Sequence, residues 1–508
     1  MPNRLSAWLW RRFVRRASWV VAVVAFCSTA VSPAAAAPPA PLVMPGWPKA
    51  AAAGRLFPGP GGGVVALSNV ALKEVAAAYD VSGRLLWANQ RQPGCGNCVS
   101  GSQRPQLWQD GTYGPLGATG SDYWAVDRHG RTVAGCKGPV LAGGACLVSL
   151  ADFDPVRVGL NPGVALSRDG AEVWRHIESD LIWVPDMSDW PAPVVDLAGN
   201  VYAAFGNAYP GASGLDVTRV LALDAASGGL RWRRLMPARV VDGLESGVLV
   251  DHLGTTVALD AQGKERWRLD TALGSPVQAI PDPARGRVIV TLRYVDDVRV
   301  ASLRLTDGTI QWITPKDRVV QSVTVGSSGT VYVGLDRSEF VHQVRAYRPD
   351  GTVAWLMPTG EPAVGALEMR DRTVMVATSN GWRAMLTRVD PRRTAPPVRE
   401  TSIDIRPHRM VVGCGLICGL TRGRGGVLTI RTPVPVRVRF LVVGRDGKRR
   451  RSVAMGLPVD AQPGTTHSRF VAAVDDGVGP VTLEARWRVN GRLRSRQIHL
   501  TVLGTKPR

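Results

Sequence analysis

One hydrophobic and polar pattern recurs along most of the chain. Apolar and polar residues alternate, a polar turn ends in glycine, and tryptophan follows four residues after that glycine. Alternation predicts a half-buried strand, and a turn ending in glycine predicts a hairpin because glycine supplies the positive φ of a tight turn. Each copy therefore predicts two antiparallel strands. The complete copies pair Gly83 with Trp87, Gly170 with Trp174, Gly228 with Trp232, Gly263 with Trp267, Gly308 with Trp312 and Gly351 with Trp355.

The spacing of these hairpins predicts a propeller. A seventh copy keeps Gly130 but has Ala134 in place of tryptophan, and further strand pairs turn at Gly199 and Gly329. Units of about four strands that repeat in this way are typical of propeller blades. We expect an all-β fold in which residues 47–405 form an eight-bladed, or alternatively seven-bladed, β-propeller that closes by pairing its first and last strands. The repeated tryptophans are predicted to pack between blades, because burying an indole removes about 150–250 Å² from water.

The repeat resembles that of pyrroloquinoline-quinone (PQQ) propellers. The resemblance is clearest in Ala258, Asp260, Gly263 and Trp267, and it covers roughly residues 45–405. It implies the propeller fold but not one activity, since the family includes both quinoprotein dehydrogenases and a non-catalytic subunit of the outer-membrane barrel-assembly machine. The dehydrogenases bind PQQ with calcium beneath a ring of two adjacent cysteines. This chain has no adjacent cysteine pair, and its nearest substitute is Cys95-Gly-Asn-Cys98.

The first residues predict export. Five arginines precede a short apolar run from Trp19 to Phe26, and alanines follow at 34–37. The run is shorter than the ~20 apolar residues of a membrane-spanning helix, so residues 1–37 are predicted to be a cleaved signal peptide and 38–46 a linker. No transmembrane segment is expected after cleavage. Twin-arginine export and a lipoprotein anchored through Cys27 are the alternatives, although Phe26 stands where a lipoprotein signal needs a small residue.

Cleavage would leave six cysteines, an even number that favours disulfides in an exported chain. Proximity in the sequence favours three local bridges, although six cysteines allow 15 connectivities. The candidate pairs are Cys95 with Cys98, Cys136 with Cys146, and Cys414 with Cys418.

The C-terminal residues predict a second, basic unit. Prolines at 391, 396 and 397 mark a boundary, and residues 406–508 contain alternating segments with hairpin turns at Asp446-Gly447 and Asn490-Gly491. This pattern is similar to immunoglobulin- or fibronectin-like β-sandwiches. In the last hairpin Leu493 and Ile498 cannot both face inward without a bulge, which leaves the strand pairing open.

Charge is concentrated in this unit. The chain carries +21, and residues 409–508 hold 17 arginines and 2 lysines against 5 acidic residues. An exported basic module suggests binding to anionic polymers, although an ordinary solvated surface explains the charge equally well. The candidate polyanion-binding residues are Arg437, Arg439, Lys448, Arg449, Arg450, Arg451, Arg486 and Arg488.

The sequence favours a non-catalytic binding protein at the bacterial cell surface or in the medium. The propeller would bind an unidentified protein partner, and the basic module an anionic cell-surface polymer. The alternative is a PQQ- or metal-dependent oxidoreductase, for which no catalytic or metal-binding residue can be named from the sequence.

Overall fold

The computed structural model of the chain describes residues 39–51, 54–70, 73–91, 106–107, 113–116, 123–136, 146–154, 159–168, 171–178, 193–206, 218–269, 271–295, 297–338, 341–379, 384–396, 399–406, 409–411, 426–434, 436–443, 449–451, 459–461, 466–471 and 479–503. No helix in these ranges is long and apolar enough to cross a membrane. The predicted signal peptide lies outside them.

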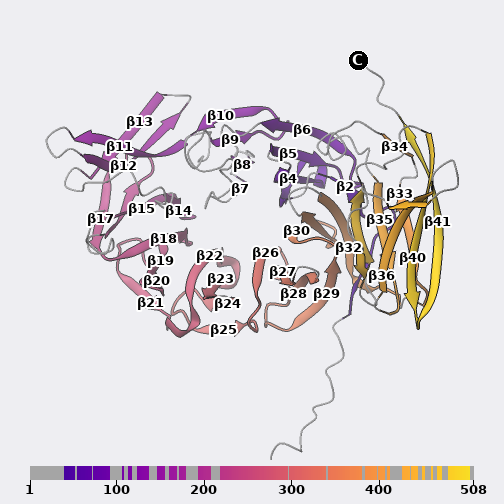
Figure 1. Ribbon diagram of the computed structural model, residues 1–508. Coiled ribbons are helices and arrows are strands. Elements are labelled where there is room, and N and C mark those ends of the chain that lie inside the picture. Colours follow the sequence, from indigo (N-terminus) through magenta and orange to yellow (C-terminus); the bar gives the residue numbers. More distant parts are fainter. Residues whose placement is uncertain are drawn as a thin grey trace, which may run out of the picture. The chain divides into compact units, whose positions relative to one another are not determined.

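Eight separate antiparallel sheets occupy the described residues up to Thr394, and they follow one another in chain order from indigo to orange in Figure 1. The first comprises β3 (Arg55–Pro58), β4 (Val64–Val70), β5 (Lys73–Tyr79) and β6 (Leu85–Arg91). The second comprises β7 (Gln106–Leu107), β8 (Tyr113–Leu116), β9 (Tyr123–Val126) and β10 (Thr132–Cys136). The third comprises β11 (Cys146–Asp154), β12 (Gly159–Arg168) and β13 (Ala171–Ile177). The fourth comprises β14 (Val194–Val195), β15 (Asn200–Gly206), β16 (Thr218–Asp224) and β17 (Leu230–Leu235).

The remaining four sheets have the same meander order. The fifth comprises β18 (Ala238–Gly243), β19 (Val248–His252), β20 (Thr255–Leu259) and β21 (Glu265–Arg268). The sixth comprises β22 (Ser275–Asp282), β23 (Arg287–Tyr294), β24 (Asp297–Arg304) and β25 (Ile310–Ile313). The seventh comprises β26 (Val319–Val325), β27 (Val331–Ser338), β28 (Val341–Tyr347) and β29 (Val353–Thr359). The eighth comprises β30 (Ala363–Glu368), β31 (Val374–Ser379) and β32 (Ala384–Thr394), joined by β1 (Pro41–Val43) and β2 (Lys49–Ala50). Short 3-10 turns lie at η1 (Pro60–Gly62), η3 (Thr271–Leu273) and η4 (Pro283–Arg285).

The recurring sequence pattern corresponds to the last hairpin of a sheet. In the fifth sheet, the carboxylate of Asp260 accepts hydrogen bonds from the backbone N–H groups of Gln262 and Lys264, at 2.9 and 2.8 Å, and so shapes the turn. Gly263 has a φ of 78°, which confirms the positive φ predicted for it. Trp267 pairs with Ala258 across the strands, and the register shifts by one residue between them and the turn. The alanine of the motif is therefore the small residue opposite the indole.

Each repeated tryptophan joins its own sheet to the next. The indole N–H of Trp267 donates to the carbonyl of Leu305 at 3.0 Å, and its ring lies against Gly308 in the next turn. A Cβ added at Gly308 would lie 2.7 Å from that ring. The same arrangement recurs where Gly130 lies on Trp87, Gly228 on Trp174, Gly263 on Trp232 and Gly351 on Trp312.

Hydrophobic clusters also lie between neighbouring sheets. Leu249 and Trp267 of the fifth sheet pack in one cluster with Val288 and Val290 of the sixth. Because a sheet buries its apolar face only against its neighbours, each one depends on the sheets beside it.

The N-terminal segment completes the eighth sheet. Strand β1 pairs with β32, so residues 41–43 form a strand rather than part of the predicted linker. Trp47 lies against Gly83 of the first sheet, in the relation that the repeated tryptophans have with the following turns. Lys49 donates to the carbonyl of Ser82, and Arg388 of β32 donates to the carbonyl of Val81 at 2.6 Å. The eighth sheet is thereby bonded to the first.

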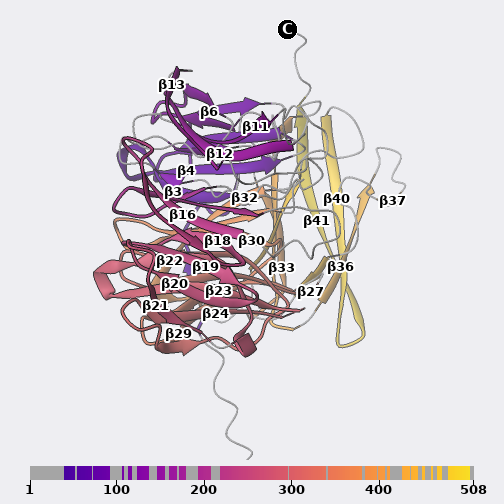
Figure 2. The same cartoon turned by 90° about the vertical axis from the view of Figure 1, so that its left-hand side faces the viewer.

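The C-terminal residues form two further sheets. One comprises β33 (Ser402–Arg406), β35 (Gly426–Arg431) and β39 (Thr466–Val471). The other comprises β34 (Arg409–Val411), β36 (Val436–Val443), β37 (Arg449–Arg451), β38 (Val459–Ala461), β40 (Gly479–Val489) and β41 (Arg492–Leu503), and Figure 2 shows β36, β40 and β41 side by side. Ile403 and Ile430 of the first sheet share one core with Val438 and Leu483 of the second. Strand β33 belongs to this unit, so its boundary lies before Ser402 instead of at residue 406.

Candidate functional site

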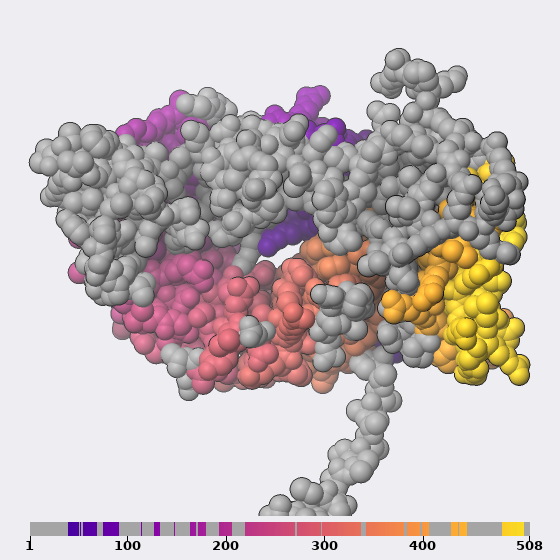
Figure 3. Space-filling model, in the orientation of Figure 1, coloured from indigo at the N-terminus to yellow at the C-terminus, as the bar shows by residue number. Residues whose placement is uncertain are grey.

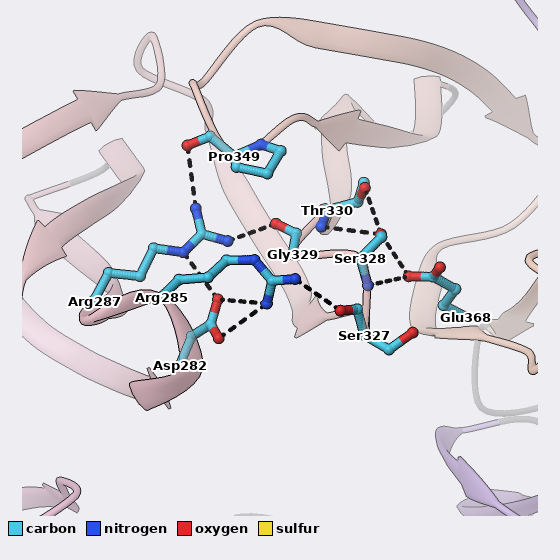
Figure 4. A network of polar contacts seen from close by, with 9 residues as sticks. All are labelled: Asp282, Arg285, Arg287, Ser327, Ser328, Gly329, Thr330, Pro349 and Glu368. Atoms are coloured by element: carbon cyan, nitrogen blue, oxygen red, sulfur yellow. Dashed lines mark hydrogen bonds and ion pairs between the residues drawn. The ribbon is translucent and has the colours of Figure 1, made fainter.

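A polar network links three consecutive propeller sheets (Figure 4). Its centre is Asp282, at the end of β22, whose carboxylate binds two guanidiniums. Arg287 Nε lies 2.9 Å from Asp282 Oδ2, and Arg285 Nη1 lies 3.2 Å from Oδ1. Arg287 is only 2% exposed, so its charge is balanced where water cannot screen it.

The two arginines then bond to the next sheet. Arg287 donates to the carbonyls of Gly329 and Pro349, at 2.5 and 3.2 Å, and Arg285 donates to the carbonyl of Ser327 at 2.8 Å. Ser328 in the same turn donates from Oγ to Glu368 of the eighth sheet, at 2.7 Å. A recess of about 530 Å³ adjoins the network, lined by Arg285, Arg287, Gln311, Trp312, Pro349 and Asp350. All three guanidinium nitrogens of Arg287 have acceptors within the protein. We therefore interpret this network as a structural link between sheets.

A second charged cluster joins the third and fourth sheets. Glu178, which follows β13, is 3% exposed and lies close to one histidine and two arginines. His176 Nε2 lies 3.0 Å from its Oε1, while Arg219 Nη1 and Arg233 Nη1 lie 2.9 and 3.1 Å from its Oε2. Burial raises the pKa of Glu178, but hydrogen bonds from His176 and Arg219 and the charge of Arg233 outweigh burial and lower the pKa from 4.5 to about 2. The carboxylate is therefore ionised at neutral pH.

The predicted tryptophans all lie in the last strand of a sheet. Trp174, Trp267 and Trp355 are buried, whereas Trp87, Trp232 and Trp312 are half-buried. Trp47, which lies between β1 and β2 before the first repeat, was not selected from the sequence.

Only two of the predicted disulfide cysteines fall within described residues. Cys136 ends β10 and Cys146 begins β11. Cys95, Cys98, Cys414 and Cys418 lie outside the described residues, as does Lys448 of the predicted basic turn. Within the described ranges no group of three His, Cys, Asp or Glu side chains could hold a metal ion.

Four predicted arginines share one face of the C-terminal module. Arg437 and Arg439 alternate in β36 with the buried Val438 and Phe440. Arg439 lies directly opposite Arg486 of β40, and Arg488 lies two residues further along that strand. The structure thus brings the two predicted arginine pairs into one sheet. Of the basic turn, Arg449, Arg450 and Arg451 form β37, which pairs with the other end of β36.

Acidic residues compensate part of this face. Glu484 is 4% exposed and accepts hydrogen bonds from Arg486 at 2.9 and 3.1 Å. Arg437 lies opposite Asp460 in the pairing of β36 with β38. Arg439 and Arg488 are the arginines of this face that remain exposed and have no acidic partner among the described residues.

The last hairpin adds three exposed arginines that the sequence reasoning did not select. The pairing of β40 with β41 is regular, with Ile498 opposite Leu483 and buried, whereas Leu493 is 59% exposed. No bulge is needed, because Leu493 faces solvent. Arg492, Arg494 and Arg496 lie opposite Val489, Trp487 and Ala485 and are exposed.

Comparison with known families identifies a PQQ-like propeller repeat region. Residues 246–341 match the family model described as outer membrane protein assembly factor BamB. These residues span β19 to β21 of the fifth sheet, the whole sixth sheet and part of the seventh.

Among individual proteins, the chain is similar to the serine/threonine-protein kinase AfsK of Streptomyces griseus, with 33% identity over 127 residues. The match covers 22% of this chain and 14% of the kinase. Among solved structures, the C-terminal WD40 domain of Sif2 aligns with 69% of this chain and 99% of that domain, at 10% identity and a TM-score of 0.43. The Dos1 propeller aligns with 70% of this chain and 94% of its own, at 10% identity and a TM-score of 0.40.

Proposed function

We propose that the protein is an exported, non-catalytic binding scaffold, in which each of the eight sheets is one blade of a closed propeller and the C-terminal sheets form a basic β-sandwich. The propeller would bind a protein partner, and the basic module would hold an anionic polymer of the cell surface. The tryptophans and buried ion pairs support a structural role for the repeats, because they link neighbouring sheets.

The observation that carries the polymer-binding function is the register of Arg439 and Arg486. Like charges directly opposite each other on a sheet are destabilising, and an anion bound to Arg439 would relieve the repulsion that remains in this pair. Guanidiniums bind oxyanions through a planar fork of donors. Glu484 offsets the charge of Arg486, which leaves Arg439 and Arg488 for an external anion.

Binding of the full chain to an immobilised polyanion at increasing salt tests this function. The wild type should bind at low salt and lose affinity steeply toward physiological salt, because bound phosphates release counterions. R439Q/R488Q should bind more weakly. R293Q/R318Q, which removes two exposed arginines of the propeller, should bind as the wild type does. Equal weakening of both variants, or no binding by the wild type at low salt, would contradict the proposal.

Export has a separate chemical test. A mature chain that begins near Pro38 in an oxidising compartment should contain no free thiol, since its six cysteines would pair. Intact mass after alkylation of the denatured, unreduced protein measures this directly. Alkylation at several cysteines would contradict the predicted disulfides.

A further inference from the structure

Three arginines of β41, on the face that they share with Trp487 of β40, form a regular row. Arg492, Arg494 and Arg496 alternate with Leu493 and Ser495, so all three lie on one face of the strand. Alternate residues of a strand are about 6.7 Å apart. All three side chains are exposed. The yellow surface in Figure 3 includes these C-terminal strands.

Acidic residues are sparse near the row: Asp460 lies on β38, which pairs with β36 and not with β41, and Asp404 of β33 lines the same recess as Arg496. Glu484 is the acidic residue of β36, β40 and β41, and it is bound to Arg486 on the opposite face. The described residues supply no ion pair to Arg492, Arg494 or Arg496. Their free donors therefore present three guanidiniums in a line.

The strand that carries the row is open along one edge. Strand β41 pairs with β40 along its length, whereas β34 pairs only with Thr501–Leu503 at its far end. Among the described strands none covers the edge from Arg492 to Leu500. The three exposed guanidiniums therefore lie beside an edge that no described strand occupies.

The spacing matches a phosphodiester chain. Successive phosphates joined through three carbons are six bonds apart. An extended peptide spans about 3.5 Å for every three bonds, so six bonds span about 7 Å. Three arginines at strand spacing can therefore each meet one phosphate. Nucleic acids share this spacing, but proteins that bind single strands also stack the bases on exposed aromatic rings. Phe440 of β36 and Trp487 of β40 are buried, at 6% and 8% exposed, and so offer no such surface.

We infer that Arg492, Arg494 and Arg496 form a binding site for a linear polyol-phosphate polymer of the teichoic-acid type. The inference rests on the proposed polymer binding and adds a second contact site, on a different face from Arg439 and Arg488. It also names phosphodiester as the chemistry that the site selects.

Titration of the full chain with poly(glycerol phosphate) tests the site. Raising the salt from 50 to 200 mM should weaken binding, and the three phosphate contacts should add about 20-fold to that loss of affinity. R492Q/R494Q/R496Q should therefore lower the affinity at 50 mM salt at least tenfold and reduce the slope of log K against log salt by about two. R293Q/R318Q/R370Q removes the same charge from exposed propeller positions and should leave both values unchanged. Thermal melts of both variants check that the fold is intact.

Other outcomes separate this site from the proposed function. If R439Q/R488Q loses binding while R492Q/R494Q/R496Q keeps it, polymer binding stands and the β41 site is wrong. Equal affinity for poly-glutamate would show simple charge attraction and overturn the phosphodiester assignment. Tighter binding of oligo(dT) would identify a nucleic-acid surface instead. If the wild type binds none of these polymers, both proposals fail.

Discussion

The repeat glycines meet two structural requirements at once. Gly263 adopts a φ of 78°, and a Cβ there would lie 2.7 Å from the indole of Trp232 in the preceding sheet. The left-handed conformation costs other residues about 1–2 kcal/mol, and the overpacking adds about 1–3 kcal/mol. Gly199 has a similar φ of 86° but nothing within 4 Å of its Cβ position.

Gly263→Ala should therefore lower the free energy of unfolding by about 2–5 kcal/mol, whereas Gly199→Ala should cost only the conformational part, about 1–2 kcal/mol. Urea denaturation of the two variants measures the difference. Equal losses would mean that the contact with Trp232 contributes nothing to the need for glycine at position 263.

Trp267 makes the equivalent contact with Gly308, and its indole fills the space between the fifth and sixth sheets. It is 5% exposed and belongs to the cluster between the fifth and sixth sheets. Trp267→Ala should cost about 3–5 kcal/mol through a large cavity, as measured by denaturant unfolding. Ile310→Ala, at a position that is 39% exposed, is the control and should have a much smaller effect. An unchanged midpoint for Trp267→Ala would contradict the packing role.

At the scale of the elements, buried ion pairs link neighbouring sheets in addition to the apolar clusters. Glu178 joins β13 to Arg219 of β16 and Arg233 of β17, and its pKa is lowered to about 2. The unfolded chain has the ordinary pKa of 4.5, so this ion cluster stabilises the fold above that pH. The stability is lost as pH falls from 4.5 through 2, because the carboxylate then takes up a proton.

Glu178→Gln should lower the stability at pH 7 by about 3 kcal/mol, since it removes the buried carboxylate that forms ion pairs with Arg219 and Arg233. The variant should also lose less stability than the wild type between pH 5 and pH 2. Unfolding free energies across this range check both effects. Glu172→Gln, which breaks an exposed pair with Arg175, should change little. If the wild type and Glu178→Gln lost equal amounts of stability between pH 5 and pH 2, Glu178 would not be the cause of the acid sensitivity.

The sequence predicted elements where a local rule sufficed. The hairpin turns were predictable because tryptophan recurs four residues after glycine, with an aspartate within the four residues before that glycine. The burial of Val438 and Phe440 follows from alternation alone. The contact of Trp47 with Gly83 was not predictable, because the strands around it pair with β32, far along the chain. The row at Arg492 was missed because alternation in a strand does not reveal which face remains exposed beyond the core.

At the scale of the whole molecule, the N-terminal segment bonds the last sheet to the first. Removal of residues 38–50 would delete β1, β2 and Trp47 and expose an edge of β32. The shortened chain should melt at a lower temperature and bind more of a dye that detects exposed apolar surface. Removal of residues 38–40 alone, which precede β1, should have little effect. Equal melting of both truncated chains would contradict closure by this segment.

This closure also sets an order of events for synthesis. Leu42 leaves the ribosome early, but its partner Asp390 follows about 350 residues later, so the pairing is among the least local contacts of the chain. The intermediate sheets can form one after another, yet the edges that β1 and β32 will share stay unpaired until the last sheet arrives. A chain halted midway is thus exposed to association with other chains. If the chain is exported as proposed, β1 reaches the far side of the membrane before β32 and stays unpaired there until β32 arrives.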